Sequence, residues 1–202
     1  MPTFLRTHLT ALRMLLVMTV ILGIAYPLLV TGVSQLAFRQ RANGSIVEVD
    51  GKPVGSSLLG QRFDLPQSDP SAPARPDPKW FQPRPSAGGY DPAASGASNL
   101  GPNSADLLKA VQERRAAIAA FDGVDPATVP PDALTASGSG LDPHISVAYA
   151  KEQIDRVARE RGLPAAQLDR LVEEHTDGRS LGFLGQPGVN VLELNQAVAE
   201  LK

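Results

Sequence analysis

A short glycine-rich stretch contains the residue types of a hydrolase triad. Residues 137–146 read Ser-Gly-Ser-Gly-Leu-Asp-Pro-His-Ile-Ser and include Ser137, Ser139, Asp142 and His144. A working triad needs a hydroxyl, an imidazole and a carboxylate that approach one another from well-separated positions. Here all of them lie close together on one loop, and neither serine stands in a Gly-x-Ser-x-Gly elbow. We therefore predict that Asp142 and His144 turn the chain and satisfy backbone groups, without catalysing a reaction.

Other patterns of catalytic or cofactor sites are also missing from the sequence. Neither a P-loop nor a dinucleotide-binding Gly-x-Gly-x-x-Gly occurs, and the chain has no cysteine and three histidines. His175 closes an amphipathic stretch and is predicted to cap a helix, while Glu173, Glu174 and Asp177 are predicted to form a solvated acidic face. A formal charge of −2 argues against nucleic-acid binding. We expect no catalytic and no metal site.

One apolar stretch near the start organises the chain. Residues 14–38 carry no charged side chain, and their length of about 25 positions exceeds the roughly 20 that cross a bilayer. A secretory signal peptide has a shorter apolar region of about 7–15 residues and a small-residue cleavage site, and buried core helices are usually shorter too. The sequence therefore predicts a cytoplasmic flank (1–13), a transmembrane helix (14–38) and one extracytoplasmic domain (39–202).

The orientation and the packing of this helix rest on weaker signals. Two arginines precede the apolar stretch and two follow it, but acidic residues follow only the second pair, which favours an N-terminus in the cytoplasm. Pro27 lies within the stretch, between Gly23 and Gly32. Proline in a membrane helix is tolerated mainly where neighbours compensate, and small residues allow close approach, so we expect other membrane helices to pack here.

The remaining residues predict an α+β domain. A hairpin is expected at 44–55, where Asp-Gly marks the turn, and a short strand at 134–136. Capping and periodicity predict helices that begin at Asn103 or Ser104, at Ser146, at Pro164 and at Asn190, and that end near residues 123, 162, 178 and 201 respectively.

Between these elements, residues 64–102 are rich in proline, glycine and serine. That composition is typical of a disordered linker. Against this interpretation, the segment contains Trp80, Phe81 and Tyr90, and Trp80 is the only tryptophan in the chain. We therefore predict an ordered irregular segment that wraps on the domain or on a partner.

Six segments resemble one family of proteins, the KdpC family, which supplies the C subunit of the bacterial Kdp potassium-transporting P-type ATPase. In chain order they are Tyr-Pro-Leu-Leu-Val-Thr-Gly (26–32), Gly-Ser-Ser-Leu-Leu-Gly-Gln (55–61), Phe-Gln-Pro-Arg-Pro-Ser-Ala (81–87), Ser-Gly-Ala-Ser-Asn-Leu-Gly-Pro (95–102), Thr-Ala-Ser-Gly-Ser-Gly-Leu-Asp-Pro-His-Ile-Ser (135–146) and Gly-Phe-Leu-Gly-Gln-Pro-Gly-Val-Asn-Val-Leu-Glu-Leu-Asn (182–195). They cover nearly the whole chain.

The resemblance implies a single-pass subunit of the inner membrane with its soluble domain outside. The implied partners are a channel-like potassium-binding subunit, a P-type ATP-hydrolysing subunit and a small stabilising peptide. The family is described as a catalytic chaperone that raises the ATP affinity of the hydrolysing subunit. Because ATP is cytoplasmic, this effect would reach an outside domain only through coupled membrane helices. No cofactor is assigned to the chain itself, and an involvement of ATP is expected only through the other subunits of the complex.

The preferred function is thus a non-catalytic accessory subunit that stabilises the pump and caps its external potassium entrance. The alternative is a free-standing, membrane-anchored periplasmic binding module. Irregular loops that carry aromatic residues suit a permanent interface. The residues predicted to contact partners are Tyr26, Pro27, Trp80, Phe81, Arg84, Tyr90, Asp142 and His144.

Overall fold

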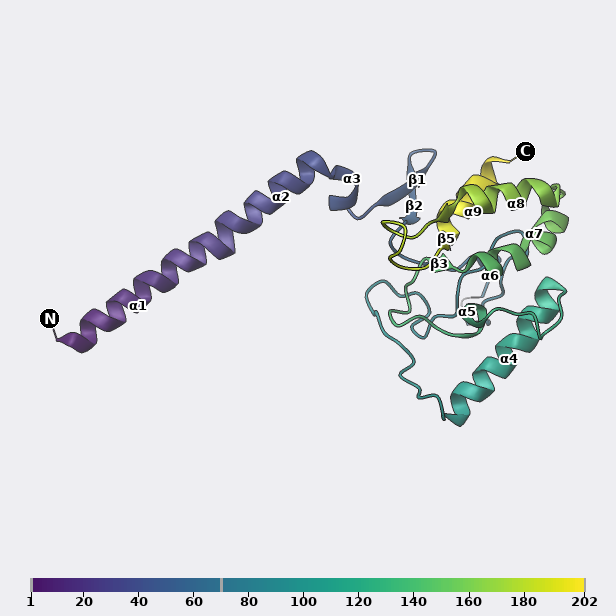
Figure 1. The fold of residues 1–202 in the computed structure, drawn as a ribbon, viewed down its shortest axis with the longest axis horizontal. Helices are drawn as coiled ribbons and strands as arrows, with labels where there is room; N and C mark the ends of the chain where they lie inside the picture. The colour runs from purple at the N-terminus through teal and green to yellow at the C-terminus, as the bar shows by residue number, and fades with distance from the viewer. Residues whose placement is uncertain (1, 70, 202) are drawn as a thin grey trace. The chain divides into compact units, whose positions relative to one another are not determined.

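The computed structural model describes residues 2–69 and 71–201 (Figure 1). The chain divides into two compact units between Ile46 and Val47. The first unit is dominated by one long helix, and the second combines helices with two small antiparallel sheets. This is the α+β architecture that the sequence predicts.

The first unit contains a continuous 35-residue apolar helix, Thr3–Ala37, none of which is buried. It comprises α1 (Thr3–Val20), the π-helical turn η1 (Ile21–Ala25) and α2 (Tyr26–Ala37), and the short α3 (Arg39–Ala42) follows. At 1.5 Å per residue the helix is about 50 Å long, against a hydrocarbon core of about 30 Å. It begins earlier than the uncharged stretch that starts at residue 14, so its first turns carry the basic residues Arg6 and Arg13.

The π-helical turn ends at Ala25, two residues before Pro27. Proline has no backbone N–H, and its ring collides with the carbonyl one turn earlier, so an α-helix cannot continue undisturbed through it. Instead, this turn of the helix contains one additional residue, and Tyr26 N–H donates to the carbonyl of Ile21, five residues earlier. The proline therefore changes the helical register locally without ending the helix.

The predicted hairpin begins at the last residue of the first unit and is formed by β1 (Ile46–Val49) and β2 (Lys52–Ser56). Its two turn residues, Asp50 and Gly51, have φ values of 52° and 73°. Such left-handed pairs match the twist of the flanking strands, which is why Asp-Gly favours a two-residue hairpin turn.

A second sheet was not expected from the sequence. Strand β5 (Gly188–Asn190) lies between β3 (His144–Ile145) and β4 (Thr176–Asp177), and both pairings are antiparallel. In register, His144 lies opposite Asn190 and Thr176 opposite Val189. The strands are two or three residues long, too short for the alternation of polar and apolar residues that reveals a strand.

The described residues of the second unit also form six helices, and four of them begin near the predicted residues. They are α4 (Ala105–Asp122), α5 (Pro131–Leu134), α6 (Val147–Glu152), α7 (Ile154–Arg161), α8 (Ala165–Glu174) and α9 (Val191–Glu200). The side chains of Ser104, Ser146 and Asn190 accept backbone hydrogen bonds at the starts of α4, α6 and α9. These predicted caps are confirmed.

Three expectations about these elements were wrong. The strand at 134–136 is absent, because Pro131 supplies a preset first helical residue and α5 occupies 131–134. The helix from Ser146 is interrupted at Gln153, whose buried side chain binds backbone groups of a distant segment. Helix α8 ends at Glu174, because the next residues pair with β5.

The core of the second unit lies between the helices and the three-stranded sheet. Helix α9 contacts α8 and β5, and α6 contacts α7, α8 and β5. The largest apolar side chains with almost no exposure are Phe81, Ile145, Leu168, Leu194, Val157, Val172, Val189 and Val198. One of them, Phe81, comes from the irregular segment, so that segment helps to build the core.

Candidate functional site

Two buried amide side chains hold the irregular segment against the helices. Phe81 N–H donates to Oδ1 of Asn195, and Nδ2 of Asn195 donates to the carbonyl of Phe81, both at 2.9 Å. In the same way Gln153 accepts from Gln82 N–H at 2.6 Å and donates to its carbonyl at 3.1 Å. The two amide side chains bind backbone N–H and C=O groups that would be paired with a neighbouring strand in a sheet. The segment is therefore ordered on the domain at these residues.

A buried arginine fastens the same segment. Arg156 is 1% exposed, and its Nε donates to Oδ1 of Asp122 at 2.6 Å. Its Nη1 donates to the carbonyls of Pro78 and Trp80, and its Nη2 to Gln153. A buried charge is tolerated only when it is paired and hydrogen-bonded in this way. The ion pair of Arg156 and Asp122 therefore has a structural role, because the other N–H groups of the guanidinium donate to backbone carbonyls and to the buried side chain of Gln153.

The aromatic residues of the segment have different surroundings. The Phe81 side chain is 0% exposed, so the expectation that it contacts a partner is wrong, and its role is in the core. Trp80 is half-buried against the core, and the guanidinium of Arg161 stacks 4.7 Å from its ring centroid. Tyr26, in the first unit, is 59% exposed, and its neighbour Pro27 is also exposed.

The remaining predicted residues of the second unit converge on one charged cluster. Nη1 of Arg84 lies 2.9 Å from Oδ2 of Asp142. The other oxygen of Asp142 accepts from the backbone N–H of His144 at 3.0 Å and lies 3.6 Å from its ring Nδ1. Nε2 of His144 lies 3.4 Å from Asp177. We call Arg84, Asp142, His144 and Asp177 the Arg84 cluster; it links the irregular segment to β3 and β4.

The electrostatics of the Arg84 cluster favour its charged forms. The contact with Asp142 raises the pKa of His144, and Asp177 adds to this rise. Hydrogen bonds from His144 and the charge of Arg84 lower the pKa of Asp142. Tyr90 supports the cluster because its hydroxyl donates to the carbonyl of Arg84 at 2.6 Å. Burial, with the nearby charge of Asp142, raises the pKa of Tyr90 to about 12, which keeps that proton in place.

The Arg84 cluster borders a polar hollow of about 330 Å³. Asp132, Ser146, Gln186 and Pro187 are among its other lining residues. The carboxylate of Asp132 is already occupied, since it accepts from both the backbone N–H and the hydroxyl of Ser146 at 2.7 Å. Within residues 2–69 and 71–201 no group of three or more His, Asp or Glu side chains is arranged to hold a metal ion. The arrangement suits electrostatic bracing between loops.

The serines of the glycine-rich loop also serve structure. Ser139 Oγ accepts from Leu141 N–H at 3.1 Å, and Ser86 Oγ donates to the carbonyl of Gly140 at 2.7 Å. The ring nitrogens of His144 face carboxylates, and Asp142 caps its own turn. The prediction that Asp142 satisfies a backbone group is confirmed, whereas the contacts of the His144 ring within the described residues are with two carboxylates. His175 likewise places Nδ1 2.9 Å from the carbonyl of Leu171, at the end of α8.

The spacing Gly-x-Ser-x-Gly does occur once in the chain, at residues 178–182. A nucleophile elbow places its serine in a sharp turn from a strand into a helix. Here Ser180 lies in an exposed loop between β4 and β5, and its carbonyl closes a turn by accepting from Phe183 and Leu184 N–H. The pattern is therefore a turn and has no elbow geometry.

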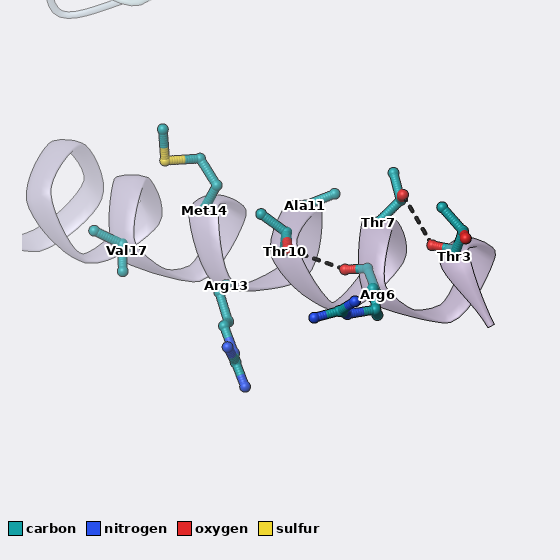
Figure 2. A pocket seen from close by; sticks show the side chains of 8 residues that line it. All are labelled: Thr3, Arg6, Thr7, Thr10, Ala11, Arg13, Met14 and Val17. Atoms are coloured by element: carbon teal, nitrogen blue, oxygen red, sulfur yellow. Dashed lines mark hydrogen bonds between the residues drawn. The ribbon is translucent and has the colours of Figure 1, made fainter. Parts of the chain in front are cut away.

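A second hollow lies along α1, and Figure 2 shows its lining residues. All of them, from Thr3 to Val17, belong to the same helix, so the hollow is an open helix face. Thr7 and Thr10 donate to carbonyls one turn earlier, which hides their hydroxyls within the helix. Arg6 and Arg13 leave the helix on one side and form a basic stripe.

Comparison with known proteins gives a consistent result over the whole chain. A family model described as "K+-transporting ATPase, c chain" (KdpC) matches residues 8–200. A protein of Kineococcus radiotolerans named "Potassium-transporting ATPase KdpC subunit" is 58% identical over 200 residues, which cover 98% of this chain and 95% of that protein. Proteins of the same name from Streptomyces avermitilis (50% identical; 94% and 91% covered) and Mycobacterium tuberculosis (51%; 97% and 99%) are also similar.

Proposed function

Because this chain belongs to the KdpC family and is thus an accessory subunit of a potassium-transporting ATPase, we propose that it anchors, stabilises and externally caps the pump without catalysing a reaction itself. The observation that carries this proposal is the unburied apolar helix Thr3–Ala37, joined to a domain whose charged residues brace loops. A domain tethered in this way is suited to hold and orient larger membrane subunits.

The helix is proposed to cross the inner membrane once, with its N-terminus in the cytoplasm. The uncharged part of the helix exceeds the thickness of the hydrocarbon core, and an unburied apolar surface of this length is stable only in lipid or against other apolar surfaces. The stripe of Arg6 and Arg13 precedes that part (Figure 2). Two arginines also follow the helix, so the number of arginines is equal at both ends. Glu48 and Asp50 come after the second pair only, which favours an N-terminus in the cytoplasm and a domain outside.

The partners are proposed to be the other subunits of the same pump. These are the channel-like potassium-binding subunit, the P-type ATP-hydrolysing subunit and the small stabilising peptide. The register change before Pro27 supports helix packing in the membrane, since the proline leaves one backbone carbonyl without its usual donor. A neighbouring helix that carries a polar side chain would supply that donor.

Any influence on ATP affinity is proposed to act through these membrane contacts. An outside domain and a cytoplasmic nucleotide site affect each other only if both bias one conformational equilibrium of the complex. ATP would then bind the hydrolysing subunit. Titration of the full-length chain in detergent with ATP at millimolar concentration should give no saturable signal, and a saturable one would contradict this part.

The direct test of the proposed function is purification of the tagged full-length chain from native membranes in mild detergent. The eluate is assayed for potassium-stimulated ATP hydrolysis. We expect the ATP-hydrolysing subunit and the activity to elute together with the chain. A folded chain that elutes alone would favour the free-standing, membrane-anchored periplasmic binding module instead.

A further inference from the structure

The loop between β4 and β5 carries large apolar side chains that are exposed and do not belong to the hydrophobic core of the domain. Leu181 is 82% exposed, Phe183 69% and Leu184 49%. Leu181 is the most exposed large apolar side chain described in the second unit. Every residue from 177 to 187 is exposed, and Figure 1 shows the loop in yellow-green beside β5. We call residues 180–185 the apolar tip.

Backbone hydrogen bonds within the apolar tip close it into a turn. Ser180 and Leu184 form an antiparallel bridge, and the carbonyl of Ser180 accepts from the N–H of Phe183 and of Leu184. Gly182 N–H donates to the carbonyl of Arg179 at 3.0 Å. A closed turn of this kind presents its side chains in one geometry, so a partner that binds them loses little conformational entropy.

The backbone at Leu181 is also strained. Its φ is 54°, in the left-handed region that glycine and asparagine adopt readily and a leucine adopts at a cost. The turn would be more favourable with asparagine at this position. An exposed leucine in a strained conformation contributes little to the fold, which indicates that its side chain serves contact with something else.

The charges around the tip argue against a lipid surface. Residues 173–187 contain one arginine, no lysine and three acidic side chains. Recognition of anionic lipid headgroups uses clusters of basic residues, and lipid interfaces favour tryptophan and tyrosine, which this stretch also lacks. A protein recess that is apolar at its centre and neutral or basic at its rim is complementary to the tip.

The small size of the tip limits how it can bind a partner. Three side chains bury far less surface than the roughly 1,200 Å² of a stable interface, so the tip cannot hold a free partner by itself. It is effective when a second contact already holds the two proteins together, because linked contacts act at high local concentration. In the proposed function that second contact is the membrane helix.

We propose that the apolar tip inserts into an apolar recess on the external face of another subunit of the pump. Leu181 and Phe183 are the anchoring side chains, in the manner of the few buried residues that dominate interface energetics. This inference rests on the proposed function, since the membrane helix must bring the partner within reach. It assigns the docking contact to residues outside those predicted from the sequence.

A site-specific cross-link tests the inference. Phe183 is replaced by the photoreactive residue p-benzoylphenylalanine in the tagged full-length chain, in membranes that contain the other pump subunits. The same probe at Leu108 on α4, which is 59% exposed, is the matched control. We expect irradiation to yield an adduct with another pump subunit from position 183 and not from position 108.

The outcomes separate this inference from the proposed function. An adduct with lipid, an adduct with a second copy of the chain, equal yields from both positions, or no adduct at all would overturn the inference, provided that the chain still co-purifies with the pump. Failure of the unmodified chain to co-purify would overturn the proposed function, and this inference with it.

A second variant separates docking from folding. Leu181→Asn removes the apolar side chain and relieves the backbone strain, so the melting temperature should stay the same or rise. The affinity of the chain for the rest of the pump should nevertheless fall about tenfold or more, as for an interface hot spot. Leu108→Gln should leave the affinity unchanged. An affinity for Leu181→Asn equal to that of the wild type would overturn the role of Leu181.

Discussion

Replacing Asn195 by alanine should loosen the irregular segment. The Asn195 side chain is 2% exposed and is the only described side chain that binds both backbone groups of Phe81, each at 2.9 Å. Alanine can neither accept from Phe81 N–H nor donate to its carbonyl. Both polar groups would lose their partners inside the core.

The size of the effect follows from those two bonds. A buried backbone group left without a partner costs about 1–3 kcal/mol, so two of them cost about 2–6 kcal/mol. For a domain of this size each kcal/mol lowers the melting temperature by about 2–4 °C. Asn195→Ala should therefore melt about 4–24 °C below the wild type.

The assay uses a reporter that the chain already contains. Trp80 is the only tryptophan, and it is the residue before Phe81, so its fluorescence reports on the segment that Asn195 holds. Thermal unfolding of the full-length chain in detergent is followed at this signal. Asn103→Ala, at an exposed turn residue, is the matched control and should change the free energy of unfolding by less than about 0.5 kcal/mol. Equal melting temperatures for the two variants would refute the reasoning.

Three further predictions concern charged groups. Arg156→Met leaves Asp122 buried and unpaired and should lower the free energy of unfolding by about 3–5 kcal/mol, measured by denaturant titration. The pKa of Glu152 is raised to about 7 by burial and by Asp122, so this carboxyl binds its proton more tightly in the folded state, and stability should fall as pH rises from about 4.5 to 7. Glu152→Gln should abolish that fall, which amounts to about 1–2 kcal/mol after allowance for solvent screening. The pKa of His144 is raised in the folded state. The stabilisation by its charge should therefore be complete below its ordinary pKa of 6.5 and be lost as pH rises through the folded value. Melting curves taken from pH 5 to 9 should show that His144→Ala removes this dependence.

Each of these predictions has a control and a refuting result. Arg159→Met, which disrupts only an exposed contact with Glu160, should leave stability nearly unchanged, and an equal loss in both arginine variants would contradict the role of Arg156. A pH profile of Glu152→Gln that matches the wild type would show that Glu152 does not carry the neutral-pH dependence. Destabilisation by His144→Ala that is equal at pH 5 and pH 9 would show that packing, and not charge, explains its contribution.

The helices could be predicted well from the sequence because their signals are local. The apolar stretch, the caps at Ser104, Ser146 and Asn190, and the hairpin turn at Asp50-Gly51 each depend on a few neighbouring residues. The family resemblance, which the comparisons confirm, also rests on short segments in chain order. The interruption at Gln153 has no local signal in the sequence, and the contact of its buried side chain with the backbone of residue 82 appears only in the structure.

The candidate sites depended on contacts between distant residues, and there the sequence was less informative. Aromatic content indicated that residues 64–102 are ordered, but burial of Phe81 in the core, opposite Asn195, appears only in the structure. The three-stranded sheet joins strands too short to carry a pattern, and the apolar tip reads in sequence as an ordinary connection. The sequence by itself determined the apolar helix, the helix starts and the family, since these depend on local propensity and composition. The tertiary structure decided which residues are buried, paired or exposed, because those properties arise when segments distant in the sequence pack together, such as Phe81 and Asn195, which are 114 residues apart.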